Sequence, residues 1–116
     1  MTLFSAILIA CVPATGDSGP VPDSEIPALD CATVPSVTWG NWAHGYFTTQ
    51  CEGCHAVNTP NRYGAPPAVT FDSEADVVLR KERVYARVLV DATMPPAGGL
   101  TDDDRNLLEI YLSCGI

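Results

Sequence analysis

Five consecutive residues near the middle of the chain, Cys51-Glu52-Gly53-Cys54-His55, constrain its structure more than any other stretch. Two thiols three positions apart, followed directly by an imidazole, are the attachment signature of c-type haem. One short turn brings both thiols to the edge of a porphyrin, and the next residue places its imidazole beneath the iron. A C-x-x-C pair alone would also fit zinc or a redox dithiol, so His55 is the residue that favours haem.

Length and charge limit the other possibilities. With 116 residues the chain has room for one small domain and an additional segment. Its apolar fraction of 47% permits a core, and a covalently bound haem would enlarge the core of so small a domain. The formal charge of -8 argues against a nucleic-acid partner and favours a protein partner with a basic docking surface.

The first residues are typical of an export signal. Residues 3–10 form an apolar run that is too short to span a bilayer, which takes about 20 residues. The run ends in Leu8-Ile9-Ala10-Cys11, which resembles the lipobox of bacterial lipoproteins. We therefore expect a signal peptide over residues 1–10, lipidation of Cys11, and a membrane-anchored protein in the periplasm or cell envelope. Signal cleavage further on, or a misassigned start codon, are the alternatives.

Residues 11–35 are expected to form a lipidated N-terminus and an extended tether, followed by a domain over residues 36–116. Five of the ten prolines lie before residue 36, and no helical or strand period is visible there. Of the five cysteines, two are assigned to haem and Cys11 to lipid, so Cys31 and Cys114 remain. In an oxidising compartment these two are expected to form a disulfide.

Apolar periodicity predicts three helices. The first, over residues 37–50, carries one aromatic face made of Trp39, Trp42, Tyr46 and Phe47. The second, over residues 74–90, is expected to bury Ala75, Val78, Leu79, Val84, Tyr85, Val88 and Leu89. The third, over residues 101–114, is expected to bury Leu107, Leu108, Tyr111 and Leu112. Capping boxes are predicted at Ser73 with Asp76 and at Thr101 with Asp104, and Gly115 is typical of a helix terminator.

A basic stripe of three arginines, Arg80, Arg83 and Arg87, follows the helical period of the second helix. It is consistent with a docking or propionate-facing surface, or with a solvated face that forms helical pairs such as Asp76 with Arg80. The solvated face is the preferred interpretation. His44, on the first helix, is expected to be a surface or half-buried histidine and not a ligand.

Met94 would be the only methionine left after removal of a signal peptide. Pro95 moves it out of helical geometry, and Pro95 and Pro96 together stiffen the loop that follows. A rigid loop that holds one thioether suits the distal side of a haem. A methionine that fills a gap in the core is the alternative, but the loop position of Met94 argues against it.

In this order, the aromatic helix, the C-x-x-C-H motif, the Met-Pro-Pro segment and the last helix resemble a small bacterial class I (monohaem) cytochrome c. The resemblance covers about residues 37–112. It implies an all-α fold with three main helices around one covalently bound haem. It also implies attachment through Cys51 and Cys54, and iron ligation by His55 and Met94.

The same resemblance implies two further roles. A proline carbonyl after the haem motif orients the histidine ring in this family, a role for Pro66 or Pro60. Arg62 would face a haem propionate. The lysines that usually surround the haem edge in this family are absent from this chain, so the redox partner is left open.

These features together predict electron transfer between redox proteins and not catalysis, because no pair of catalytic acids and no nucleophile–base arrangement is visible. A haem-based sensor, or the haem subunit of a larger oxidoreductase or peroxidase, is the alternative, in which Met94 would be displaced. A zinc or dithiol module built on Cys51, Cys54 and His55 is a third reading, disfavoured because no fourth zinc ligand lies nearby.

Overall fold

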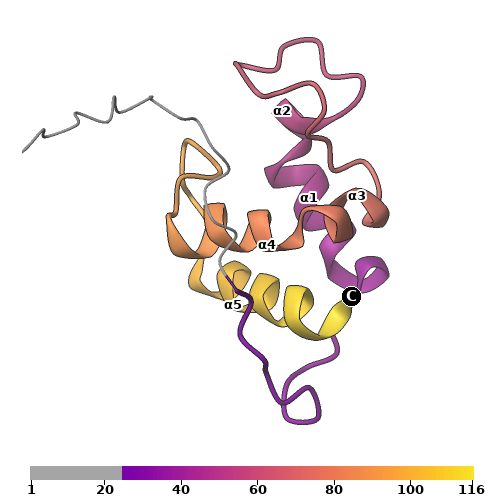
Figure 1. Ribbon diagram of the computed structural model, residues 1–116, viewed down its shortest axis with the longest axis vertical. Helices are drawn as coiled ribbons and strands as arrows, with labels where there is room; N and C mark the ends of the chain where they lie inside the picture. Colours follow the sequence, from indigo (N-terminus) through magenta and orange to yellow (C-terminus); the bar gives the residue numbers. More distant parts are fainter. Residues whose placement is uncertain (1–24) are drawn as a thin grey trace, which may run out of the picture.

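Helices joined by loops build the part of the chain that the computed structural model describes, residues 25–116, and no strand occurs in this range (Figure 1). The first helical segment consists of η1 (Trp39–Ala43), α1 (His44–Gln50) and α2 (Glu52–His55), where η denotes a π-helical turn. The second consists of α3 (Glu74–Leu79), α4 (Lys81–Val84) and η2 (Tyr85–Val90). The third consists of α5 (Asp102–Ile110) and η3 (Tyr111–Gly115). The all-α expectation is confirmed for these residues.

The first segment begins two residues later than predicted, because Thr38 and Asn41 form a capping box. The Asn41 N–H donates to Thr38 Oγ1 at 3.2 Å, and the Thr38 N–H donates to Asn41 Oδ1 at 2.8 Å. A Thr-x-x-Asn pair provides the same two acceptors as the commoner Thr-x-x-Glu pair. The sequence therefore contains a capping signal for this helix start, which a prediction from aromatic periodicity alone overlooks.

The second segment is interrupted at Arg80, where one continuous helix over residues 74–90 was expected. Its predicted start is confirmed, since Ser73 and Asp76 form the capping box, with distances of 3.3 and 3.2 Å. Arg80 then leaves the helical region with φ -122° and ψ 17°. Its guanidinium donates to the main-chain oxygens of Asp76 and Ala68. The expected Asp76–Arg80 carboxylate pair is wrong, because the Asp76 carboxylate already accepts from Ser73.

The buried side chains of this segment differ from those predicted. The buried residues are Val77, Val84, Ala86 and Val88. Ala75, Val78 and Leu79 were expected in the core but are exposed, because the buried face runs through Val77, Val84 and Val88 at helical spacing. The side chain of Leu79 is 73% exposed, although it lines the cavity described below.

The third segment begins at its predicted cap. The Asp104 N–H donates to Thr101 Oγ1 at 3.1 Å, which is one of the two hydrogen bonds of the predicted capping box. Gly115 ends η3 as expected, but close packing is what requires it. A Cβ at this position would overlap the Val37 carbonyl oxygen and the Tyr111 ring.

The core is built around Phe47, which is fully buried. Its ring contacts those of Trp39, Tyr46, Phe71 and Tyr111, with centroid distances between 5.3 and 6.4 Å. Aromatic pairs at such distances contribute about 0.5–1.5 kcal/mol each beyond their buried area. The predicted aromatic face therefore joins the first helical segment to the third, and Phe71 connects it to the loop after α2.

The chain before η1 is attached to the third segment. A disulfide joins Cys31 to Cys114, as the cysteine count had predicted, with a Cα–Cα distance of 5.6 Å. Ser113 Oγ donates to the Pro27 carbonyl oxygen at 3.1 Å, and Ile26 and Leu29 pack against the core. The described part of the expected tether thus lies on the helices. Cys11 and the expected signal peptide lie outside the described residues.

Within residues 25–116, none of the helices has the length and apolar character that crossing a membrane requires.

Candidate functional site

A cavity of about 780 Å³ lies where the loop after α2, the α3–η2 segment and the residues around Met94 meet. This volume falls within the roughly 300–1,000 Å³ of typical ligand and cofactor sites. The predicted site residues that line it are Cys51, Cys54, His55, Arg62, Pro66 and Met94. The structure therefore brings together in one cavity residues that the sequence places in two separate stretches.

The C-x-x-C-H motif forms a single turn at the wall of this cavity. Cys51 has φ -120° and ends α1, so the chain changes direction there before α2 begins. The N–H groups of Cys54 and His55 both donate to the Cys51 carbonyl oxygen, at 3.2 and 2.9 Å. This turn explains how both thiols and the imidazole come to line the same cavity.

The two motif cysteines are free, half-buried thiols. Burial, and to a lesser extent the Glu52 carboxylate, raises the pKa of the Cys51 thiol to about 12. Reactive dithiols have the opposite property, since their nucleophilic cysteine has a lowered pKa. The environment of Cys51 therefore does not favour the redox-dithiol alternative.

The zinc alternative also finds no support in the arrangement of side chains. Among residues 25–116, no three or more His, Cys, Asp or Glu side chains converge to hold a metal ion. A structural zinc site needs four such ligands in tetrahedral geometry. Cys51, Cys54 and His55 do not find the remaining partner in the described part of the chain.

His55 is oriented by main-chain groups. Its Nδ1 lies 3.1 Å from the Val69 carbonyl oxygen, which can only accept, so Nδ1 carries the proton in this hydrogen bond. Nε2 is then the nitrogen left to bind a metal. The Phe71 N–H donates to the His55 carbonyl oxygen at 2.9 Å, and the Phe71 ring packs edge-on to the imidazole. His55 is thus fixed through both its ring and its backbone.

The expectation that a proline carbonyl orients this ring is not met. The Pro66 carbonyl oxygen instead accepts from the Val69 N–H at 3.0 Å. Pro66 thereby makes the turn that presents the Val69 carbonyl to His55, and it lines the cavity. Pro60 is exposed and lies outside the cavity lining.

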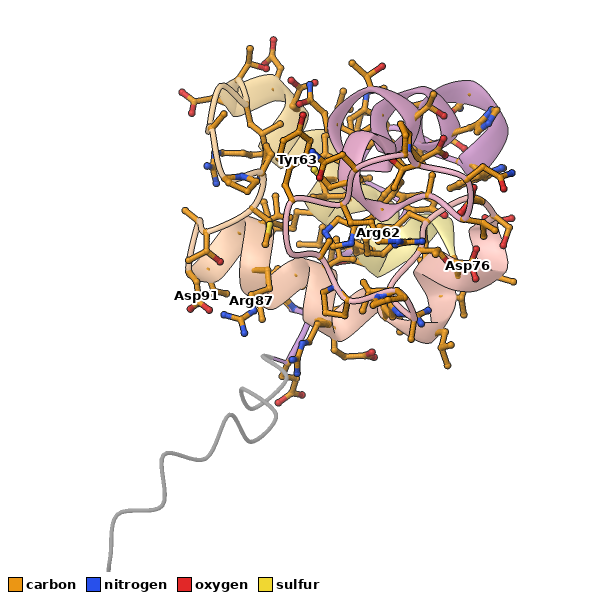
Figure 2. The ribbon with its side chains drawn as sticks, turned by 90° about the horizontal axis from the view of Figure 1, so that it is seen from above. Arg62, Tyr63, Asp76, Arg87 and Asp91 are labelled. Atoms are coloured by element: carbon orange, nitrogen blue, oxygen red, sulfur yellow. A yellow bond between two sulfur atoms is a disulfide. The ribbon has the colours of Figure 1, made fainter. Side chains whose placement is uncertain are left out.

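Arg62 has a donor without a protein partner. Its Nη2 donates to the Ala56 carbonyl oxygen at 2.8 Å, whereas its Nη1 is buried and makes no hydrogen bond. Figure 2, which looks onto the loop that carries Arg62, shows the side chain near the centre of the view. A buried, unpaired donor on a charged group is costly. An acidic group on a molecule inside the cavity would satisfy it.

Apolar side chains at the cavity are unusually exposed. Tyr63 is 79% exposed, Leu79 73% and Met94 37%, and all three line the cavity. Exposure of large apolar groups in one place is typical of a binding site. A flat apolar molecule in the cavity would cover them and supply the buried area that the helices alone do not give.

The basic stripe belongs to the cavity wall. Arg80, Arg83 and Arg87 all line it, together with Arg62, and Glu82 is the one acidic residue in the lining. The preferred interpretation of a solvated face with helical pairs holds in part, because Arg83 is exposed and Arg87 forms an i,i+4 pair with Asp91, although all three arginines also line the cavity. The helical period identified the stripe, but only the packing of α4 and η2 against the loop after α2 decides what it faces.

Met94 lies in an irregular segment, residues 91–100, which we call the Met94 strap. The N–H groups of Thr93 and Met94 both donate to the Arg87 carbonyl oxygen, at 2.9 and 3.1 Å. The Arg87 guanidinium also pairs with Asp91 at 3.5 Å, and Figure 2 shows the two side chains together at the edge of the molecule. The end of η2 thus holds the backbone of Met94 at the cavity.

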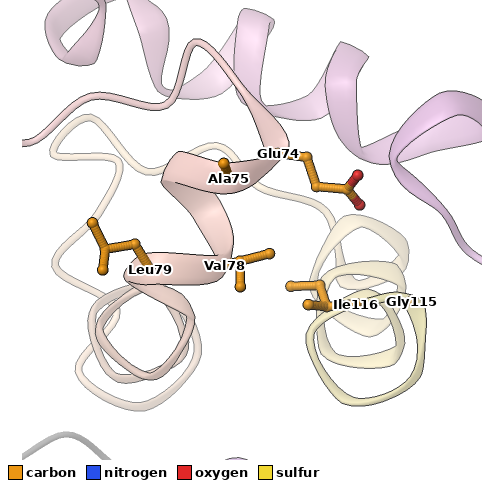
Figure 3. Close-up of a pocket in the computed structure, with 6 residues that line it drawn as sticks. All are labelled: Glu74, Ala75, Val78, Leu79, Gly115 and Ile116. Atoms are coloured by element: carbon orange, nitrogen blue, oxygen red, sulfur yellow. The ribbon is translucent and has the colours of Figure 1, made fainter.

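Two other features lie outside this site. His44 is exposed, as expected, and packs against Trp39 with a ring distance of 5.2 Å. A second, shallower depression of about 650 Å³ lies between α3 and the end of η3 (Figure 3). Its lining consists of Glu74, Ala75, Val78, Leu79, Gly115 and Ile116. None of the predicted site residues is among them.

Comparison of the chain with protein-family models, with curated proteins and with solved structures finds no match. The functional assignment therefore depends on the motif and on the geometry of the cavity.

Proposed function

We propose that this protein is a monohaem c-type cytochrome with a class I-like fold that transfers single electrons between redox proteins. One observation carries the proposal. A single cavity of haem-compatible volume is lined by Cys51, Cys54 and His55 from one turn and by Met94 from a distant strap. These four side chains are the two thiols and the two axial ligands that a His/Met c-type haem requires.

Each residue then has a defined role. Cys51 and Cys54 would form the two thioether bonds to the haem edge, while His55 Nε2 and the Met94 thioether would ligate the iron. The haem would supply the one-electron chemistry, cycling between ferrous and ferric iron. The protein would hold the ligands in place and set the reduction potential, which Met ligation and apolar walls both raise.

The remaining cavity residues fit the same molecule. Haem combines a large apolar ring with two carboxylates, and the lining combines exposed apolar side chains with arginines. The unpaired Nη1 of Arg62 would find its acceptor in a propionate.

A direct test is covalent attachment. Protein from a host with the c-type maturation machinery should give a coloured band after denaturing electrophoresis and haem staining. A Cys51→Ser, Cys54→Ser double variant should lose the colour, whereas a Cys31→Ser, Cys114→Ser variant should keep it. Haem that acid–acetone removes from the wild type would rule out thioether attachment.

A haem-based sensor or the haem subunit of an oxidoreductase is the second candidate, and one observation favours it. Met94 is 37% exposed, and only its backbone is hydrogen-bonded to the helices. A displaceable sixth ligand would let small molecules reach the iron. Fast carbon monoxide binding by the wild type, in place of the slow binding expected of a carrier, would favour this second function.

Envelope attachment through Cys11 is part of the proposal. A multiply acylated N-terminus would keep the protein at the membrane, because a single acyl chain binds only reversibly. Fractionation of cells that express the wild type or Cys11→Ala tests this. The variant should move to the soluble fraction, and an unchanged distribution would leave a cytochrome without a lipid anchor.

A further inference from the structure

Backbone strain in the described chain is concentrated at the cavity. Tyr63 and Ala92 are its non-glycine residues with left-handed backbone, at φ 49° and 53°. L-residues adopt this region at a steric cost and hold it only where the surroundings impose it. Tyr63 lines the cavity, and Ala92 directly precedes Thr93 and Met94, which also line it.

The strain at Ala92 has a specific geometric result. η2 ends at Val90 with Asp91 as its C-cap, and Ala92 is the first residue after that cap, where a left-handed residue is the usual way to reverse the chain. After the reversal, the Thr93 and Met94 N–H groups converge on the Arg87 carbonyl oxygen, and Thr93 Oγ1 lies 3.4 Å from the same atom. Glycine is the common residue in this position, so an alanine here is unusual.

The strap is also restrained on the other side of Met94. Pro95 and Pro96 fix their own φ angles and limit the conformation of the residue before them. The backbone of Met94 is therefore set between a helix-ending turn and two prolines. Its side chain has no such restraint and remains partly exposed.

We infer that Ala92 is a positioning residue for Met94, because its left-handed turn anchors the backbone of the ligand to the end of η2 and so places the thioether. The inference rests on the proposed function, since it requires Met94 as the sixth ligand. Arg87 takes part through its carbonyl oxygen, and its ion pair with Asp91 spans the last turn of the helix that carries this acceptor.

The experiment is a series at position 92 in haem-loaded protein. Glycine and asparagine accept left-handed backbone, whereas the β-branched valine strongly resists it. Ala92→Gly and Ala92→Asn should therefore keep Met94 in place, and Ala92→Val should displace it. Ala97→Val is the matched control, because Ala97 is exposed in the same strap and has no left-handed backbone.

Three measurements on each variant separate positioning from general destabilisation. They are the red absorption band of thioether-ligated ferric haem, the rate of carbon monoxide binding to ferrous protein, and the midpoint of denaturant unfolding. We expect Ala92→Val to weaken the band and to raise the carbon monoxide rate by about tenfold. The glycine and asparagine variants and Ala97→Val should stay within about twofold of the wild type on both spectroscopic readouts.

Equal effects of Ala92→Val and Ala97→Val, or an Ala92→Val protein with an intact band, would overturn the role of Ala92. So would a shift of the unfolding midpoint with the band and the carbon monoxide rate unchanged. If Ala92→Val does not accumulate, the temperature at which the band disappears decides. It should be no lower in Ala92→Gly and Ala92→Asn than in the wild type, and a lower value contradicts the inference. A wild-type protein without the band would instead overturn the ligand set, and with it both proposals.

Discussion

The two candidate iron ligands are held in very different ways. Around His55, the loop of residues 56–72, which we call the His55 loop, is held by side-chain and main-chain hydrogen bonds, three of them to the motif and two within the loop. These are His55 Nδ1 to Val69 O, Phe71 N to His55 O, Val57 N to Asp72 Oδ2, Arg62 Nη2 to Ala56 O, and Thr59 Oγ1 to Gly53 O. Met94 depends on a single acceptor, the Arg87 carbonyl oxygen.

This difference predicts different roles for the His55 side and the Met94 side of the cavity. A typical hydrogen bond contributes about 1 kcal/mol, and bonds that share a loop reinforce one another. The His55 loop is thus a firm support whose ligand cannot turn without breaking contacts to Val69 and Phe71. On the Met94 side, the backbone is fixed and the thioether is free to move. In the proposed cytochrome, any exchange of ligands would begin at Met94.

The largest expected effect follows the loss of the firmly held ligand. His55→Ala should lower the yield of haem-loaded protein. The decrease should exceed the roughly 10–100-fold that loss of an outer partner of a metal ligand costs. His44→Ala is the matched control, because His44 is exposed and lies outside the cavity lining. Haem stain per unit of immunodetected protein is the measurement. Equal haem content in the two variants would contradict the assignment of His55.

Loss of the less restrained ligand should have a smaller and separable effect. Met94→Ala should keep its haem, because the thioethers remain. It should lose the red absorption band, bind carbon monoxide faster, and have a potential lower by a few tenths of a volt, within the roughly 0.8 V that axial ligation spans. A wild type that already lacks the band and binds carbon monoxide rapidly would show that the strap does not hold Met94 on iron, and would favour the sensor or peroxidase alternative.

The third prediction concerns the disulfide, which supports the fold outside both ligand-bearing segments. Cys31 and Cys114 lie 83 residues apart, and neither lines the cavity. Replacing both by serine should lower the free energy of unfolding by about 3–5 kcal/mol, as expected for closure of so long a loop. The absorption band and the potential should not change. Denaturant unfolding measures the first effect, and free thiols at both positions in the native protein, found by alkylation and mass spectrometry, would contradict the pairing.

Much of this arrangement is readable in the sequence. Ser73 and Thr101 mark helix starts because their side chains cap locally. The motif identifies Cys51, Cys54 and His55 because its spacing fits one turn. Local signals of this kind survive in the fold because they depend on residues three or four positions apart.

Other features have no local signal. The Val69 acceptor is a main-chain oxygen, which any residue type provides. The break at Arg80 depends on a carbonyl group that the His55 loop brings near, so it is decided by tertiary packing. Ala92 could not be singled out, since alanine is not typical of left-handed turns. The cavity-facing arginines required knowledge of which helix face meets the loop.

The smallest expected effect concerns alkaline stability. Burial, as the main cause, raises the pKa of Tyr46 and of Tyr111 above the ordinary value of about 10. For Tyr111 the Glu74 carboxylate, which accepts its hydroxyl hydrogen bond at 3.3 Å, raises the pKa further. Above pH 10 the unfolded chain ionises these tyrosines while the folded protein keeps them protonated. The unfolded state then binds fewer protons, so stability is full below about pH 10 and falls as pH rises.

Each tyrosine should contribute a slope of about 1.4 kcal/mol per pH unit above pH 10, with no effect near neutrality. Tyr46→Phe and Tyr111→Phe should each remove one such contribution, which denaturant unfolding at several pH values would detect.

At pH 7 the two variants should differ. Tyr111→Phe loses the bond to Glu74 and about 1 kcal/mol, whereas Tyr46→Phe removes a buried hydroxyl without a partner at little cost. Since Tyr46 lies on α1, next to the motif, and Tyr111 bonds to the start of α3, unequal slopes would show which of the two hydroxyls ionises first in the folded protein. An unchanged slope in both variants would mean that neither hydroxyl remains protonated in the folded protein.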